Sequence, residues 1–212
     1  MSVKQSAASG FTILELMIAA SVFAVILLVV AGGVISFTND YYKGITSSKT
    51  QDVTRSIIDT LTQSIQFGKS VSTGLSGPGG AQGICIDNTL YSYVIGQQVT
   101  DTSPNGAIHQ AYHGLIADSG GCGAPSVPNS NAALASTRRE LLGQHMRLSA
   151  LSVSSAGTLY TIHVRVIYGD DDLLVPTVGG GTNWANELCG GSITGSQFCA
   201  VSDLTTTVKQ RL

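Results

Sequence analysis

The chain has 212 residues, of which 43% are hydrophobic and 11% are charged, whereas about a quarter of the residues in a typical soluble domain are charged. Its 11 basic and 13 acidic side chains give a formal charge of -2, and this near balance argues against a phosphate-binding surface and hence against direct nucleic-acid binding. High hydrophobicity at low net charge also excludes a disordered chain, and the length suits one domain, with or without an anchor.

The longest apolar stretch lies near the N-terminus, from Leu16 to Phe37. These 22 residues carry no charge. As an α-helix they would span about 33 Å at ~1.5 Å per residue, enough for the ~30 Å hydrocarbon core of a bilayer. The pattern predicts a single transmembrane helix. Three other interpretations stay open: a buried core helix, a plain signal anchor, and a secretory signal peptide that is cut after Ala31.

One acidic residue, Glu15, directly precedes this stretch. A carboxylate inside an apolar membrane segment costs roughly 2.5–3.5 kcal/mol on insertion scales, and such a residue normally has a partner. The sequence offers no cation nearby, because Lys43 lies nearly eight helical turns downstream and Lys4 lies upstream beyond Gly10. A soluble fold gives no reason for an acid at this position.

A known family shows the same pattern. Type IV pilins and type II secretion pseudopilins have an N-terminal signal that resembles Gly10-Phe11-Thr12-Ile13-Leu14-Glu15-Leu16-Met17. In that family a short charged leader precedes the glycine, and a long apolar run follows the glutamate. The resemblance covers the N-terminal segment up to about residue 35, a length that matches one membrane-spanning helix. The order Ile13-Leu14, where Leu-Ile is commoner, is a conservative departure.

The resemblance implies how the N-terminus is processed. A prepilin peptidase would cut between Gly10 and Phe11, remove residues 1–10 as a leader peptide, and methylate the new amino group of Phe11. Glu15 would then neutralise the terminus of a neighbouring subunit during assembly, because a buried acid becomes tolerable beside a buried cation. The implied partners are other pilin subunits, the prepilin peptidase and the inner-membrane pilus assembly platform.

Beyond the transmembrane or filament-core half of the predicted helix, residues 11–37, the pattern becomes one-sided, which predicts an amphipathic continuation of the helix over residues 38–67. Charged residues at positions 52, 55 and 59 lie between the members of the apolar stripe. The stripe comprises Ile45, Val53, Ile57, Ile58, Leu61 and Ile65. Gly68 is expected to end a helix that runs from Phe11 to Phe67. Within it, Gly32 and Gly33 allow either a kink or close helix packing in lipid.

Residues 68–212 are expected to form a globular, β-rich head. Alternating apolar residues predict a strand over 160–168 with a partner over 144–153. An earlier pair is expected over 90–95 and 108–116, and a last strand over 198–208. The glycine-rich residues 69–83 are expected to form a loop. The predicted fold is therefore α+β, a pilin-like arrangement with a long N-terminal helix packed on an antiparallel sheet of four or more strands.

The head contains four cysteines, Cys85, Cys122, Cys189 and Cys199. An even number in a head that is expected outside the cytoplasm indicates disulfides rather than catalytic thiols. Pairing Cys85 with Cys122 and Cys189 with Cys199 is favoured, because these pairs close the shorter loops. The second pair would resemble the disulfide-closed C-terminal loop of many pilins. A zinc site of four thiolates is the alternative, although no CxxC spacing is present.

No catalytic residue and no cofactor is predicted. His109 and His113 have the spacing of a zinc-protease HExxH motif, but Gln110 stands where the base would be, and the segment is expected to be a strand. An acidic run follows the strand that ends at residue 168. It is a candidate calcium site, with a solvated turn as the alternative. The run comprises Asp170, Asp171 and Asp172.

The function expected from the sequence is structural rather than enzymatic. The chain is predicted to be a subunit of a type IV pilus-like filament, and a minor pilin within that class. Its C-terminal half is similar to minor pilins of the PilW or GspJ kind, especially over residues 163–169. It would lie in the inner membrane with its head extracytoplasmic, and then in the pilus at the cell surface. The alternatives are a pseudopilin of a type II secretion or competence system, and a signal-anchored extracytoplasmic binding protein or enzyme.

Overall fold

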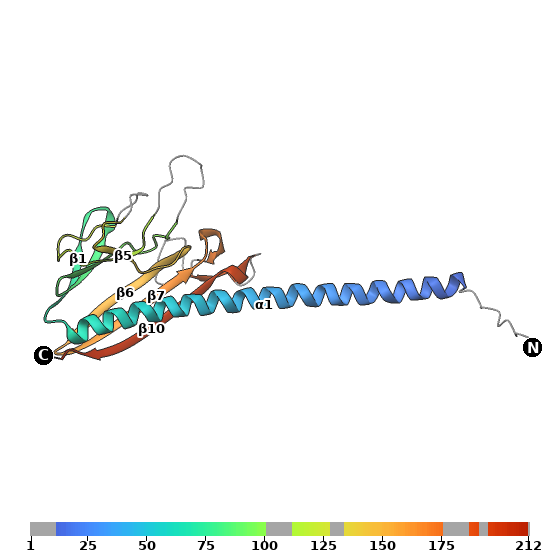
Figure 1. The fold of residues 1–212 in the computed structure, drawn as a ribbon, viewed down its shortest axis with the longest axis horizontal. Coiled ribbons are helices and arrows are strands. Elements are labelled where there is room, and N and C mark those ends of the chain that lie inside the picture. The colour runs from blue at the N-terminus through green and yellow to red at the C-terminus, as the bar shows by residue number, and fades with distance from the viewer. Residues whose placement is uncertain (1–11, 101–111, 128–133, 176–186, 191–194, 212) are drawn as a thin grey trace, which may run out of the picture. The chain divides into compact units, whose positions relative to one another are not determined.

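The structure is a computed structural model that describes residues 12–100, 112–127, 134–175, 187–190 and 195–211. The chain divides into two compact units, residues 1–41 and residues 42–212. The first unit contains the N-terminal part of one long helix. The second unit, the head, contains the rest of that helix together with the β-strands (Figure 1). A long N-terminal helix followed by antiparallel strands confirms the predicted α+β class.

The helix, α1 (Ile13–Phe67), has 55 residues and ends where it was predicted to end. Gly68 follows it, and the close approach of the preceding turn requires a glycine there. A Cβ atom at this position would lie 2.5 Å from the carbonyl oxygen of Ser64. The chain then turns away from the helix axis, and the amides of the next two residues both donate to Asp87 Oδ1. Local backbone geometry therefore fixes the end of α1.

Within the head, the buried face of α1 differs in part from the predicted stripe. The isoleucine and leucine positions from 57 to 65 are buried, as predicted. Ile45, however, is 46% exposed. Three threonines are buried instead, and their hydroxyls donate to the backbone carbonyls four residues earlier at 2.8–2.9 Å, so each of these three hydroxyls has an acceptor. These residues are Thr46, Thr50 and Thr54.

The described strands of the head form two main antiparallel sheets and a short hairpin. The first sheet has its strands in chain order: β1 (Val71–Ser76), β2 (Gln82–Ile86), β3 (Thr89–Tyr93), β4 (Leu115–Asp118) and β5 (Arg138–Glu140). The second sheet has the order β10 (Ala200–Lys209), β7 (Leu159–Tyr168) and β6 (Met146–Ala156). The hairpin pairs β8 (Leu174–Val175) with β9 (Leu188–Cys189). The described connections include the 3-10 helices η1 (Pro78–Gly80), η2 (Asp171–Leu173) and η4 (Ser196–Phe198).

The sheets correct two details of the prediction. The strands expected in one sheet are divided between two. Residues 69–83, which were expected to form a loop, contain β1 and the start of β2. That prediction was wrong because glycine occurs inside a strand: Gly74 has a φ of 71°, and the pairing of β1 with β2 shifts register between Ser72 and Leu75. Of the predicted strand 108–116, residues 108–111 lie outside the described residues, and β4 begins at Leu115.

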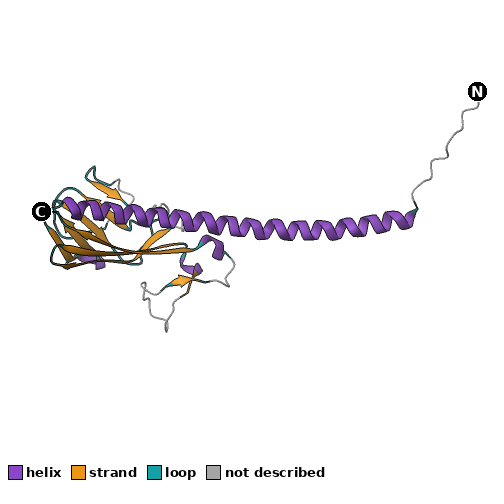
Figure 2. Cartoon of the chain, turned by 90° about the horizontal axis from the view of Figure 1, so that it is seen from below, coloured by secondary structure: helices purple, strands orange, loops and turns teal. Residues whose placement is uncertain are grey.

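The core of the head lies between α1 and both sheets. In Figure 1 and Figure 2, the part of α1 that belongs to the head lies along the sheet formed by β6, β7 and β10. Leu61 of α1 has no exposed surface and belongs to the same apolar cluster as Ile84 of β2 and Val164 of β7. Burial of apolar surface is the dominant stabilising term in folding. The second half of α1 is therefore fixed by the core of the head.

We predict that Leu61→Ala lowers the free energy of unfolding of the head by roughly 2–5 kcal/mol, because it leaves a cavity at a fully buried site. Ile45→Ala is the matched control and should change it little, since this side chain is half exposed. Chemical denaturation of the full-length protein in detergent, followed by near-UV circular dichroism, measures both. A larger loss for Ile45→Ala than for Leu61→Ala would contradict the observed helix face.

Candidate processing and assembly site

A reciprocal pair of side chains, Thr12 and Glu15, closes the first turn of α1. The Glu15 amide donates to Thr12 Oγ1 at 3.2 Å. In the other direction, the Thr12 amide donates to Glu15 Oε2 at 3.0 Å, and the Thr12 hydroxyl donates to the same oxygen at 3.2 Å. This arrangement is a capping box, in which a threonine before the helix and a glutamate three residues later satisfy each other's backbone amides.

The capping box gives Glu15 a partner that is not a cation. The T-x-x-E spacing before an apolar run is itself the sequence signature of such a box, so it could have been found from the sequence. A negative charge in the first turn also interacts favourably with the helix dipole. A polar group that keeps its hydrogen bonds costs less to remove from water than one that loses them. Thr12 therefore makes an acid tolerable at the start of an apolar helix.

The predicted cleavage position lies directly before this box. Gly10 and Phe11 are outside the described residues. A cut between them would leave the peptide bond from Phe11 to Thr12 intact, so the amide that donates to Glu15 would remain in the shortened chain. The new amino group would stand within about one helical turn of the carboxylate. The box and the predicted cut are thus compatible.

The apolar segment from Leu16 to Phe37 lies wholly within α1 and has no buried side chain. Leu28, for example, is 74% exposed. In the described part of the chain, α1 is the one helix that is long and apolar enough to cross a membrane. Contiguous exposed apolar surface of this size marks a membrane or protein contact. The segment is therefore suited to lipid or to other apolar helices.

In the head, the four cysteines form two disulfides. Cys85 pairs with Cys122 and Cys189 pairs with Cys199, with Cα–Cα distances of 5.8 and 5.7 Å. These are the pairs that close the shorter loops, and the alternative zinc site of four thiolates is not formed. The first disulfide ties β2 to the segment after β4. The second joins β9 to the residue before β10 and so closes the last loop of the chain.

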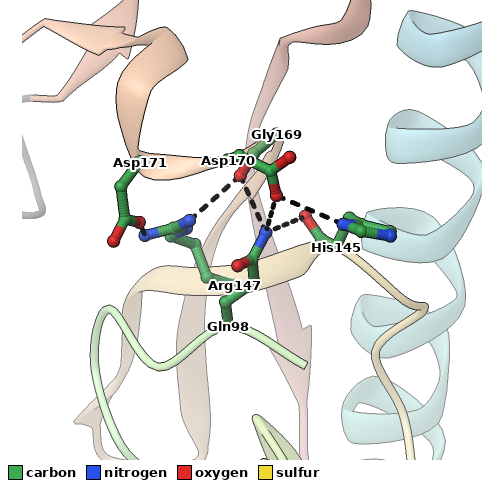
Figure 3. Close-up of polar contacts among 6 residues, drawn as sticks. All are labelled: Gln98, His145, Arg147, Gly169, Asp170 and Asp171. Atoms are coloured by element: carbon green, nitrogen blue, oxygen red, sulfur yellow. Dashed lines mark hydrogen bonds and ion pairs between the residues drawn. The ribbon is translucent and has the colours of Figure 1, made fainter. Parts of the chain in front are cut away.

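The acidic run 170–172 is divided between separate polar contacts (Figure 3). Asp170 Oδ1 accepts a hydrogen bond from Gln98 Nε2 at 2.9 Å and lies 3.2 Å from His145 Nδ1. Asp171 forms an ion pair with Arg147, whose side chain is 1% exposed. These contacts join the start of β6 to the end of β7. They give the first two carboxylates a structural role.

The remaining metal candidates are not brought together. Asp172 lines a neighbouring pocket of about 370 Å³ beside Tyr168. Within the described ranges, no group of three or more His, Cys, Asp or Glu side chains is arranged to hold a metal ion. Calcium binding therefore stays a prediction. His109 lies outside the described residues, and His113 Nδ1 lies 3.3 Å from Glu140 Oε2.

The capping box leads to a prediction for the first turn of α1. Thr12→Val removes the hydroxyl and should weaken the cap by roughly 1 kcal/mol, whereas Thr12→Ser keeps the box. Amide hydrogen exchange of residues 13–16, measured by mass spectrometry in detergent, should be faster in Thr12→Val and unchanged in Thr12→Ser. Equal exchange in both variants and the parent would show that the box does not hold this turn.

A second prediction concerns acid stability. The pKa of Asp170 lies below its ordinary range because the Gln98 amide donates a hydrogen bond to the carboxylate, and His145 adds to the effect. The ionised form therefore stabilises the fold above the ordinary aspartate pKa of about 3.9. This contribution is lost as the pH falls through the lowered value in the folded state. Thermal unfolding at a series of acidic pH values should show that the melting temperature falls less steeply with decreasing pH in Asp170→Asn than in the parent. The same dependence of melting temperature on pH in both proteins would count against this role.

Comparison with known proteins supports the interpretation of the N-terminus. Residues 5–31 match the prokaryotic N-terminal methylation motif. No curated protein and no solved structure matches the chain. The matched residues include the predicted cleavage position, the capping box and the first part of the apolar segment. The comparison therefore supports the resemblance of the N-terminal segment to the signal of type IV pilins and pseudopilins.

Proposed function

We propose that the chain is a minor pilin, a structural subunit of a type IV pilus-like filament that a prepilin peptidase processes and that assembles through its N-terminal helix. The observation that carries the proposal is the methylation motif at residues 5–31 together with an acid, Glu15, at the fifth position after the predicted cut. A secretory signal peptide or a plain anchor has no use for an acid there, because it only raises the cost of insertion.

Before assembly, the subunit is held in the inner membrane by residues 16–37, with its head outside the cytoplasm. The two disulfides of the head support this orientation, because disulfides persist in oxidising compartments. Glu15 then lies at the cytoplasmic end of the span. Its capping box with Thr12 supplies hydrogen bonds to the carboxylate while the subunit is still alone.

On assembly, the Glu15 carboxylate pairs with the methylated amino group of Phe11 on a neighbouring subunit. The pairing joins two groups that are each costly to bury alone, and it fixes the axial position of one helix against the next. The exposed apolar side chains of residues 16–37 then pack against those of neighbouring helices. Gly32 and Gly33 favour close packing or local bending there, because glycine has no side chain and lowers helix stability.

A minor rather than a major subunit is proposed because the head is large and its C-terminal half is similar to minor pilins over residues 163–169. The remaining partners follow from the same proposal. The prepilin peptidase acts on the bond between Gly10 and Phe11, the inner-membrane assembly platform extracts the subunit from the bilayer, and other pilin subunits surround its helix in the filament.

Substitutions at Glu15 separate charge pairing from helix capping. Glutamine can replace glutamate in a capping box but carries no charge, whereas alanine removes both functions. We predict that Glu15→Gln and Glu15→Ala are still cut after Gly10, and that incorporation of each into filaments falls by at least about tenfold, the effect of ~1.4 kcal/mol. Immunoblots of sheared filaments and of membranes measure incorporation and processing in the same cells.

Thr12→Ser is the matched control, because it keeps both the box and the charge and should be incorporated normally. Normal incorporation of Glu15→Gln would contradict the proposed charge pairing. Normal incorporation of Glu15→Ala would contradict any role of this side chain in assembly. Loss of cleavage in these variants would place the role of Glu15 in processing instead.

A further inference from the structure

The carbonyl groups at the end of α1 need donors from outside the helix, because the last carbonyls of an α-helix have no partner within it. In Figure 1 and Figure 2, the end of β10 lies beside the end of α1. Both ends belong to the head, residues 42–212. The residues that directly follow β10 are therefore placed to supply these donors.

The two residues after β10 both donate to carbonyls at the end of α1. The backbone amide of Arg211 donates to the carbonyl oxygen of Gln66 at 3.0 Å. The side chain of Gln210 donates through Nε2 to the carbonyl oxygen of Gly68 at 2.7 Å. These two hydrogen bonds satisfy acceptors that the helix itself leaves open. The end of α1 is thus closed by a distant part of the chain, in addition to its local backbone geometry.

Further hydrogen bonds fix Gln210 in this position. The residue is 8% exposed, and its backbone amide donates to the carbonyl oxygen of Thr158 at 2.9 Å. Its Oε1 atom accepts a hydrogen bond from the Tyr160 hydroxyl at 3.4 Å. The carbonyl of Gly68 can only accept, so Nε2 rather than Oε1 has to face it. Gln210 therefore uses both ends of its side-chain amide, and it connects α1 with β7 and with the turn before β7.

At its other end, β10 is held by a covalent link. The strand begins at Ala200, directly after Cys199, which is bonded to Cys189. Among the described strands, β10 lies at the edge of the second sheet and pairs with β7 alone. An edge strand leaves one row of its backbone groups unpaired, so the sheet secures it from one side only. The disulfide at its start and Gln210 at its end therefore fasten β10 at two points besides its pairing with β7.

We propose that Gln210 and Arg211 act as a clasp, a latch that closes the end of α1 and fastens the end of β10 to it. When the clasp is released, the last turn of α1 and the end of β10 open together, while the first sheet stays folded. The proposal is independent of the proposed function, because every contact that it uses lies within the head. It makes the residues after β10 a part of the support of α1.

Amide hydrogen exchange, followed by mass spectrometry of the full-length protein in detergent, tests the clasp. Gln210→Glu keeps the size of the side chain and an oxygen for the Tyr160 hydroxyl, but it places an acceptor in front of the Gly68 carbonyl instead of a donor. Lys209→Ala is the matched control, because Lys209 is the neighbouring residue and is exposed. Peptides from residues 60–68 and from β10 report on the clasp, and peptides from β2 and β3 report on the first sheet.

In Gln210→Glu, exchange at the end of α1 and in β10 should be at least about tenfold faster than in the parent, the effect of ~1.4 kcal/mol. Exchange in β2 and β3 should be unchanged, and Lys209→Ala should exchange like the parent throughout. Parent-like exchange of Gln210→Glu at the end of α1 would overturn the clasp. Equal acceleration in all of these elements would also overturn it, because the whole head would then have lost stability rather than this end alone.

A second variant, Gln210→Met, keeps the test decisive if the glutamate variant does not fold. Methionine has a similar length and suits a buried site, but it makes neither of the two side-chain hydrogen bonds of Gln210. Exchange at the end of α1 and in β10 should then be at least about threefold faster than in the parent, because a lost hydrogen bond costs less than an opposed pair of acceptors. Parent-like exchange in Gln210→Met would overturn the clasp as well.

Discussion

The N-terminal half of this protein depends on how one carboxylate is accommodated in an apolar helix. Glu15 directly precedes an uncharged segment that runs from Leu16 to Phe37, and no basic residue stands within reach along the helix. The capping box with Thr12 resolves this conflict locally, because the backbone and the hydroxyl of one residue supply hydrogen bonds to the acid. In the proposed filament the same carboxylate would pair with a cation of another chain, and that pairing would explain why an acid stands where a leucine would insert more easily.

The two parts of α1 draw on different sources of stability. Residues 12–41 bury no side chain and are suited to lipid or to neighbouring helices. From Thr46 onward the helix is buried by its own head, first through threonines whose hydroxyls bond back to the helix, and then through isoleucine and leucine. In the proposed function, this division would let one continuous helix serve both as an anchor and as a core element, and the apolar half would exchange lipid for protein contacts on assembly.

Much of the fold follows from local sequence patterns, and most of the differences between the predicted fold and the structure arise from tertiary contacts. The helix end at Phe67 and the strand at 159–168 depend on periodicity and a glycine stop, so they could be predicted. The threonine face of α1 could not be predicted, because a hydropathy pattern treats threonine as polar. Its hydroxyl bonds to a carbonyl of the same helix, so the side chain packs in the core as an apolar group does. The contact between Arg147 and Asp171 exists only because β6 and β7 pair. The Thr12–Glu15 box is local and could have been predicted from its spacing.

In the proposed function, cleavage between Gly10 and Phe11 would turn this arrangement into a filament subunit, since it would remove the leader and create the cation that Glu15 is proposed to meet. Mass spectrometry of the N-terminal peptide from membrane-purified protein tests it most directly. The expected result is a peptide that begins at Phe11 and carries one methyl group on its amino nitrogen. A peptide that begins at Met1, or at Gly32 after a cut of the signal-peptide type, would contradict it.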